Sequence, residues 1–543
     1  MNKNIRFAIA LCALAFFVAA AAFENAPRAG AQNAAAPQNA PAPRRPLTPQ
    51  EQRGKAIYLR SESPSGKEIT ATVSDVDVPA STVTCAGCHG LRAEGKTEAG
   101  VTAGALFWSH MLKPHTHPTG RRHGPFDEAA FARAVRNGVD PAGNELAVAM
   151  PRYRMAPEDL ADLLAYLRRI ETETDPGLSV GAVRVGTVLP TKGPLAELGL
   201  AMRDVMSAYF ADLNERGGVY GRRVEVYVAG AGADAAETTA NARRLIEQDG
   251  VFAFVGGMSA GADRELAALA GETETPFVGP ATLLPQTAAP LNRQIFYLLP
   301  GLAEQARALL NFGANNPELK KGRVVVVHPE TELAAAIAAA VEDQAQKAGL
   351  RAVVRQSYPR AGFDAKQLAA KLKGTSADAL FFFGTGGEEV ALLNESAAAG
   401  WTPNVFLLGA LTGANLSASV PAAFKDKVFI AFPTVPADIT ATGFAEFRAL
   451  QQKHKFEQRH TASQLAAFAA AKVFTEGLRR AGQDLSREKL LVALEGLYDY
   501  ETGITPHLTF GPNRRVGAAG ANVLKVDVDK KEFAPAAGWV KAY

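Results

Sequence analysis

The sequence has few cysteines and no excess of charge of either sign. Only 3 of its 543 residues are cysteines, and its formal net charge is +3. So small a net charge gives no strong basic field, and nucleic acid is therefore not an expected partner. The shares of hydrophobic residues (47%) and charged residues (21%) are ordinary for globular protein. The length suffices for several domains of average size.

The motifs of several enzyme classes are also lacking. The glycine-rich runs Gly256-Gly257 and Gly384 to Gly387 carry neither the Lys-Ser/Thr of a phosphate-binding loop nor the spacing of a dinucleotide fingerprint. There is no Gly-x-Ser-x-Gly nucleophile elbow. These absences favour a binding protein over a catalyst.

The first 31 residues have the layout of a secretory signal peptide. Lys3 and Arg6 precede an uncharged run from Phe7 to Ala22, and Ala29-Gly30-Ala31 offers a cleavage site made of small residues. The run is shorter than the roughly 20 residues that span a bilayer, although an uncleaved anchor stays open as an alternative. We therefore expect export to the periplasm, and no later stretch reads as a membrane span.

Composition divides the remaining chain into two regions joined by linkers. Residues 32–50 are rich in Ala, Pro and Gln without apolar periodicity, which is typical of a disordered linker. A first domain is expected over residues 51–172, because a helix with leucines at helical spacing begins near Pro157 and closes it. Polar residues 173–182 form the second linker, and residues 183–543 form the second region.

In this second region, short β-rich runs alternate with helical stretches. Such alternation is typical of βαβ units and parallel sheets. Some 360 residues are more than a single hydrophobic core usually serves, so we expect two α/β lobes. Lobe 1 is expected at about 183–302 and 433–510, and lobe 2 at about 303–432 and 511–543. The expected strands are 183–189, 224–228, 251–255, 276–278, 295–298, 323–327, 379–383, 405–408 and 428–431, with helices at 199–216 and 235–248.

The sharpest motif is Cys85-Ala86-Gly87-Cys88-His89. Two thiols at this spacing reach the two vinyl groups of one haem, and the following histidine can coordinate its iron. A redox dithiol or half a zinc site are the alternatives. A zinc ribbon needs a second cysteine pair, and signal cleavage leaves only Cys85 and Cys88. The motif therefore predicts one covalently attached haem c.

The first domain resembles a class I cytochrome c. The resemblance rests on Arg53 to Tyr58, Thr84 to Gly90, Met150-Pro151 and Ala165 to Arg168. It implies a small all-α domain in which His89 and Met150 are the axial ligands of the iron. Met155 is the nearest competitor for the methionine role, and core packing alone is the plainer interpretation of Met150. One of four nearby histidines could also replace Met150 or bind a surface metal: His110, His115, His117 and His123.

Residues 183 to about 540 resemble the type I periplasmic binding proteins of the branched-chain amino-acid group, the receptors of ABC importers. Several short sequence motifs, in the order typical of the family, carry this resemblance. It implies two α/β lobes that close on a small ligand like a hinge. The motifs that carry the resemblance are Asp212 to Arg222, Arg244 to Val251, Phe254 to Gly257, Thr275 to Gly279 and Thr509 to Asn513.

The loops that follow strands are the expected ligand contacts, because ligands of open α/β sheets meet the carboxyl ends of strands. Thr191, Ser259 and Thr282 are the candidates in lobe 1, where the hydroxyls of Ser259 and Thr282 could bind a carboxylate. Plain helix capping is the alternative. In lobe 2 the candidate is Glu330. The loop from Gly409 to Gly413 lacks the acid that would pair with an ammonium group, so a carboxylate without an amine fits at least as well unless Glu330 or Glu388 supplies the charge.

These observations predict a periplasmic mono-haem protein that combines one-electron transfer with binding of a small organic carboxylate or amino-acid-like ligand. Its partners would be that ligand and a periplasmic redox protein, such as a quinoprotein dehydrogenase. Two alternatives stay open. One is an ABC-importer receptor with an accessory haem, docking on a permease. The other is a haem enzyme with an open iron site.

Overall fold

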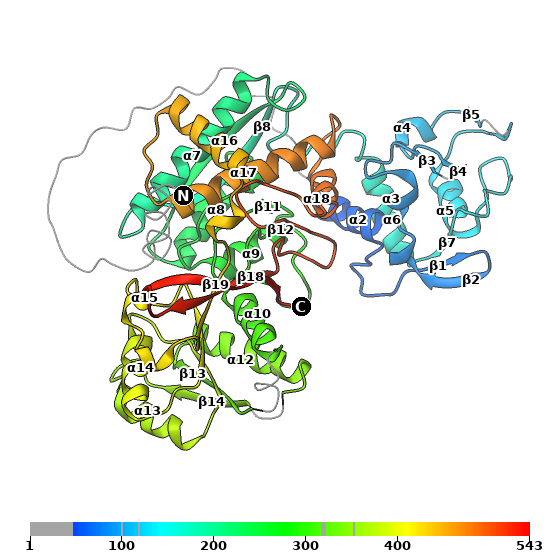
Figure 1. Cartoon of the computed structure of the whole chain (residues 1–543). Helices are drawn as coiled ribbons and strands as arrows, with labels where there is room; N and C mark the ends of the chain where they lie inside the picture. Colours follow the sequence, from blue (N-terminus) through cyan, green and yellow to red (C-terminus); the bar gives the residue numbers. More distant parts are fainter. Residues whose placement is uncertain (1–46, 99–100, 118–119, 316–321, 351–352) are drawn as a thin grey trace. The chain divides into compact units, whose positions relative to one another are not determined.

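The computed structural model describes residues 47–98, 101–117, 120–315, 322–350 and 353–543 (Figure 1). The expected signal peptide, residues 1–31, and most of the expected linker lie outside the described residues. The chain separates into two compact units whose boundary lies between Thr174 and Asp175. Within the described ranges, no helix combines the length and the apolar character that a membrane span requires.

The first unit is mainly helical, as expected. Its first helix begins at Pro49 because Thr48 caps it: the hydroxyl of Thr48 accepts from the backbone N–H of Glu51, whose carboxylate accepts from the N–H of Thr48. This start lies two residues before the expected start of the domain at residue 51. The helices are α2 (Pro49–Arg60), α3 (Cys85–His89), α4 (Trp108–Met111), α5 (Glu128–Asn137) and α6 (Pro157–Leu167).

Helices α2 and α6 pack closely at Gly54. A Cβ atom at this position would lie 2.0 Å from the carbonyl oxygen of Asp162, so only glycine permits this approach. The adjacent Arg53 guanidinium donates to both carboxylate oxygens of Asp162, at 2.6 and 3.0 Å. The buried rings of Tyr58 and Tyr166, with centroids 5.9 Å apart, continue the contact. This helix pair forms one wall of the core of the first unit.

Short antiparallel strand pairs, which the sequence did not predict, connect the helices. Strands β1 (Thr70–Val73) and β2 (Val76–Pro79) form a hairpin whose turn residues, Ser74 and Asp75, both have positive φ. Strand β7 (Arg152–Arg154) pairs with the other edge of β1. Two further pairs have two or three residues per strand: β3 (Lys96–Glu98) with β4 (Val101–Ala103), and β5 (His115–Thr116) with β6 (Arg122–His123).

Lobe 1 of the second unit is built on a five-stranded parallel sheet in the order β12-β11-β10-β8-β9. Its helices come from two separate parts of the chain, before and after lobe 2. The strands are β8 (Ala182–Pro190), β9 (Arg223–Ala231), β10 (Ala253–Val255), β11 (Phe277–Val278) and β12 (Ile295–Phe296), and the helices are α7 (Ala196–Glu215), α8 (Ala235–Glu247), α9 (Asp263–Glu272), α16 (Ala441–His454), α17 (Thr461–Ala481) and α18 (Arg487–Glu495).

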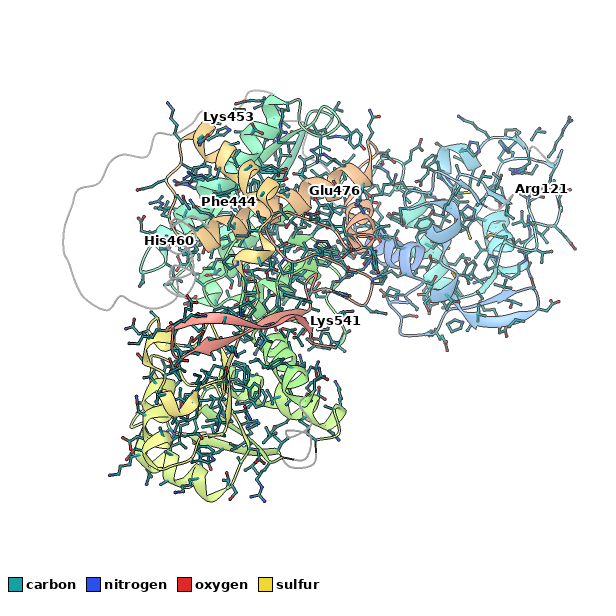
Figure 2. The ribbon with its side chains drawn as sticks, viewed as in Figure 1. Arg121, Phe444, Lys453, His460, Glu476 and Lys541 are labelled. Carbon is teal, nitrogen blue, oxygen red and sulfur yellow. The ribbon has the colours of Figure 1, made fainter. Side chains whose placement is uncertain are left out.

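Polar contacts hold these two parts of lobe 1 together. The ammonium group of Lys453, near the end of α16 (Figure 2), lies 2.6 Å from carboxylate oxygens of both Asp212 and Glu215 on α7. The buried guanidinium of Arg487 donates to the carbonyl oxygens of Val251 and Phe252, each at 2.9 Å, where the chain enters β10. The late helices are therefore integral to the sheet whose loops are the expected ligand contacts.

Lobe 2 has a seven-stranded mixed sheet in the order β14-β13-β15-β16-β17-β18-β19. The first five strands in this order are parallel, and the chain then passes through the helices of lobe 1 before it returns as two antiparallel strands. The strands are β13 (Val324–Pro329), β14 (Val353–Tyr358), β15 (Ala379–Phe382), β16 (Asn404–Leu408), β17 (Val428–Phe432), β18 (Gly520–Asp527) and β19 (Glu532–Lys541), and the helices are α10 (Leu302–Ala314), α12 (Glu332–Lys347), α13 (Ala365–Gly374), α14 (Glu388–Ala398) and α15 (Leu416–Ser419).

The contact at Gly54 can be tested by substitution. We expect Gly54→Ala to lower the free energy of unfolding of the first unit by about 1–3 kcal/mol or more, because the added methyl group meets backbone that cannot yield. Denaturant unfolding, with hydrogen exchange to assign the transition to this unit, measures the change. The control is Gly124→Ala, where a Cβ meets no atom within 4 Å. Equal stability of the two variants would contradict this packing.

Candidate functional site

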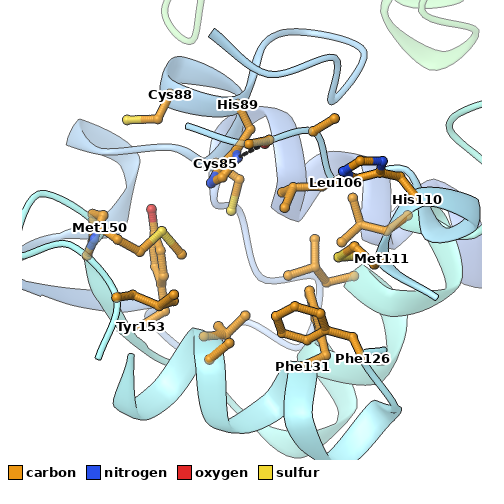
Figure 3. Close-up of a pocket in the computed structure, with 18 of the residues that line it drawn as sticks. Cys85, Cys88, His89, Leu106, His110, Met111, Phe126, Phe131, Met150 and Tyr153 are labelled. Carbon is orange, nitrogen blue, oxygen red and sulfur yellow. Dashed lines mark hydrogen bonds between the residues drawn. The ribbon is translucent and has the colours of Figure 1, made fainter. Parts of the chain in front are cut away.

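The two thiols and the histidine of the Cys-x-x-Cys-His motif lie on one short helix. Helix α3 is capped by the hydroxyl of Thr84, which accepts from the N–H of Gly87 at 3.2 Å. Residues three and four positions apart share a helix face. Cys85 therefore lies beside both Cys88 and His89, and all three line one cavity (Figure 3).

The imidazole of His89 is held in one orientation. It is 8% exposed, and its Nδ1 lies 2.7 Å from the carbonyl oxygen of Gly104, so Nδ1 carries the hydrogen. Its Nε2 is buried and has no hydrogen-bond partner. Burial lowers the pKa of His89, because water no longer solvates the imidazolium. The result is a neutral imidazole with a free lone pair, as an iron ligand requires.

The two cysteines are free thiols with different surroundings. The sulfur of Cys85 points into the cavity, and Cys88 is exposed at its edge (Figure 3). Burial raises the pKa of the Cys85 thiol to about 12. Redox-active dithiols instead depend on a thiol whose pKa is lowered. This environment therefore disfavours the dithiol alternative. Among the described residues, no group of three or more His, Cys, Asp or Glu side chains is arranged to hold a metal ion.

Met150 lies on the wall of the same cavity, in a braced loop. The guanidinium of Arg152 donates to the backbone carbonyl of Met150 and, at 3.1 Å, to that of Leu146. Arg152 passes directly over Gly138, where a Cβ would lie 1.8 Å from its Nε. The hydroxyl of Tyr153 donates to the carbonyl of Val83, just before α3. The methionine loop and the thiol helix are thus fixed relative to each other.

The cavity suits a large, mainly apolar group. Together with the open solvent at its mouth, it includes roughly 1060 Å³ of space that protein atoms do not fill. Met111, which sequence reasoning missed, lines it as Met150 does, whereas Met155 packs in the core of the unit away from the lining. The apolar lining is Leu106, Met111, Phe126, Phe131, Ala134, Val135, Leu146, Leu163 and Leu167. These residues fit a c-type haem.

In lobe 1, two of the predicted ligand contacts occupy adjoining loops. Ser259 follows β10 and Thr282 follows β11, two neighbouring strands. The backbone N–H of Ala281 donates to the carbonyl of Gly257 at 2.9 Å, which joins these loops. Both residues are half-buried, and the Thr282 hydroxyl accepts from the N–H of Leu284. Their hydroxyls retain the capacity to donate to a carboxylate.

The other two predicted contacts lie elsewhere. The hydroxyl of Thr191 lies beside Gly230 in β9, on the opposite side of β8 from β10. Glu330 is exposed in an open depression of lobe 2, where it accepts from the hydroxyl of Ser357 at 3.2 Å. The structure therefore brings Ser259 and Thr282 together but does not bring Thr191 or Glu330 to them.

Lobe 2 has two acids near the loop that lacks a carboxylate, and both are engaged. Glu388 accepts from the Tyr358 hydroxyl at 2.7 Å and from the N–H of Thr385 at 2.9 Å. Glu389, which sequence reasoning missed, is 1% exposed and accepts from the N–H of Gly413 at 2.6 Å. Burial raises the pKa of Glu389. Oε1 of Glu389 thus anchors the 409–413 loop, whereas its Oε2 is buried without a hydrogen-bond partner.

Comparison with known proteins identifies both modules. The cytochrome c family model matches residues 66–171, and the periplasmic binding protein model matches residues 182–532. "Leu/Ile/Val-binding protein homolog 7" of Brucella abortus (strain 2308) is 25% identical over 317 residues, which are 55% of this chain and 77% of the relative.

Two solved structures show the same fold as the second unit. A branched-chain amino acid ABC transporter protein from Thermus thermophilus with bound valine is 19% identical, with a TM-score of 0.51 over 66% of this chain and 97% of its own. A fatty acid ABC transporter substrate-binding protein from Thermomonospora curvata is 17% identical, with a TM-score of 0.51 over 68% of this chain and 95% of its own. The chain therefore belongs to the periplasmic binding protein family, and a cytochrome c domain precedes its binding module.

Proposed function

We propose that this protein is exported to the periplasm, carries one covalent haem c and transfers single electrons, while its second unit binds a small organic carboxylate. Cys85 and Cys88 would form the thioether bonds to the haem, and His89 and Met150 would coordinate its iron. When bound there, the haem supplies a one-electron iron couple. Its redox partner is a periplasmic protein such as a quinoprotein dehydrogenase. An importer permease is the partner if the alternative role as a transport receptor holds.

The observation that carries this proposal is the unpartnered Nε2 of the buried His89. A buried nitrogen without a hydrogen bond costs free energy, on the order of 1–3 kcal/mol. Coordination to iron removes this cost and uses the tautomer that Gly104 enforces. The lining around the thiols and Met150 is largely apolar, which limits the access of water there and favours electron transfer over reaction with solvent.

A methionine as the second protein ligand of the iron distinguishes an electron carrier from a haem enzyme. A thioether ligand favours reduced iron and raises the reduction potential. A closed coordination sphere also leaves no position for a substrate such as peroxide. Met150 is supported in this role because Arg152 fixes its backbone at the cavity wall. Met111 lies on the same cavity and is the competitor to be tested.

We expect Met150→Ala to remove the weak long-wavelength band that marks an iron–sulfur bond in the oxidised protein, and to lower the midpoint potential. Absorption spectroscopy and potentiometry of the haem-loaded full chain measure both. Met155→Ala is the matched control, because Met155 is a nearby half-buried methionine that does not line the cavity. Loss of the band in Met111→Ala, with Met150→Ala unchanged, would move the ligand role to Met111.

For the binding module we propose a carboxylate ligand without an amine. The adjoining hydroxyls of Ser259 and Thr282 provide donors for a carboxylate. The 409–413 loop provides no acid, Glu388 is engaged by Tyr358 and Thr385, and Oε1 of Glu389 is engaged by Gly413. Oε2 of Glu389 has no hydrogen-bond partner, but burial raises the pKa of Glu389 and so disfavours the charged form that an ammonium group would need. The two similar structures share one fold, although one holds bound valine and the other is a fatty acid ABC transporter substrate-binding protein, so the fold alone leaves the ligand open.

We expect the full chain to bind 4-methyl-2-oxopentanoate more tightly than leucine, which differs by carrying an ammonium group. Ser259→Ala should weaken binding of the oxo acid by about tenfold or more, because a hydrogen bond to a charged group contributes on the order of 1.5–3 kcal/mol. Isothermal titration calorimetry measures both affinities. Ser207→Ala, at an exposed position on α7, is the control. Tighter binding of leucine would support the amino-acid receptor instead.

A further inference from the structure

A compact group of histidines lines the haem cavity beside the residues proposed to hold the iron. Strands β5 and β6 pair His115 directly with His123, and the rings of His115 and His117 have centroids 4.6 Å apart. The His117 and His123 rings are 5.1 Å apart. We use the name histidine cluster for four residues: His115, His117, His123 and Arg121. All four line the cavity, with His110 next to them.

The cluster is held in place by a buried ion pair. Arg121, labelled in Figure 2, donates through Nη1 to a carboxylate oxygen of Asp140 at 2.7 Å, and Asp140 is fully buried. The other carboxylate oxygen of Asp140 accepts from the backbone N–H groups of Ala142 and Asn144, both at 2.9 Å. Asp140 therefore fixes Arg121, and the hairpin is anchored to the 138–150 loop that carries Met150.

The position of the ring hydrogen of His117 follows from the Arg121–Asp140 ion pair. The Nη2 of Arg121 donates to Nε2 of His117 at 2.8 Å, so the ring hydrogen of His117 lies on Nδ1. Burial and the neighbouring guanidinium lower the pKa of His117 to about 4. His117 is thus a neutral imidazole with one N–H to donate. Burial and the adjacent His110 likewise lower the pKa of His115. His117 and a neutral His115 each carry a ring N–H, whereas Nδ1 of His123 donates to the carbonyl oxygen of Gly124 at 2.7 Å.

We propose that the histidine cluster binds the propionate carboxylates of the haem, an inference that rests on the proposed function. The rest of the cavity lining is largely apolar and suits the porphyrin ring, while the cluster is a polar, donor-rich part of the same wall. A carboxylate enclosed in such a cavity requires hydrogen-bond donors. The ring N–H groups of His115 and His117 are such donors on the wall of this cavity.

The test compares two variants for which carboxylate binding and general charge effects predict opposite orders of the shift in midpoint potential. His115→Leu/His117→Leu removes two side chains that are neutral near pH 7. Arg122→Met removes a full positive charge from an exposed position on the same hairpin, outside the cavity lining. If the cluster binds the carboxylates, the double variant lowers the midpoint potential of the haem-loaded full chain more than Arg122→Met does, because unsatisfied carboxylates stabilise oxidised iron. If only the loss of charge matters, Arg122→Met lowers the midpoint potential more than the double variant does.

The remaining outcomes are equally decisive. His115→Asn/His117→Asn retains N–H donors and should restore most of the wild-type potential. His117→Leu alone is a milder second variant, in case the double variant fails to fold, and should shift the potential in the same direction. A shift no larger than that of Arg122→Met overturns the proposal, as does a copper or zinc ion that co-purifies and is lost with the histidines. A colourless wild-type protein would instead refute the proposed haem itself.

Discussion

The buried imidazole of His89 is the constraint on which the first unit depends. The Gly104 carbonyl takes the hydrogen of Nδ1, so the lone pair of Nε2 is left inside an apolar cavity without a partner. Such an arrangement is unfavourable unless a ligand such as iron completes it. The thiol helix, the braced Met150 loop and the histidine cluster all surround this one nitrogen's cavity. The unit is best understood as a frame for a bound cofactor.

The second unit differs in that its two lobes are built from interleaved parts of the chain. Its chain crosses from lobe 1 to lobe 2 and back, and then returns to lobe 2 as β18 and β19. The two lobes are therefore joined by more than one connection. In lobe 1 the Ser259 and Thr282 loops are fixed to each other, and in lobe 2 Oε1 of Glu389 holds the 409–413 loop.

Much of the fold and the core of the haem site follow from sequence patterns that act locally. The five residues from Cys85 to His89 and the buried strands of both sheets are such patterns. Strand β14 was missed because Arg355 and Gln356 interrupt its apolar pattern at the sheet edge, and β18 and β19 because their pairing depends on distant partners. Met111 and the pairing of His115 with His123 depend on tertiary packing, which no local spacing encodes.

Attachment of a haem to the two thiols is the central claim. The most direct measurement is the mass of the intact protein, matured in a host that attaches haem to cytochromes, followed by the mass of the peptide containing Cys85 and Cys88. The account predicts the added mass of one haem on this peptide and no free thiol at either cysteine. An unmodified peptide with both thiols free, from a host that matures another cytochrome normally, would contradict it.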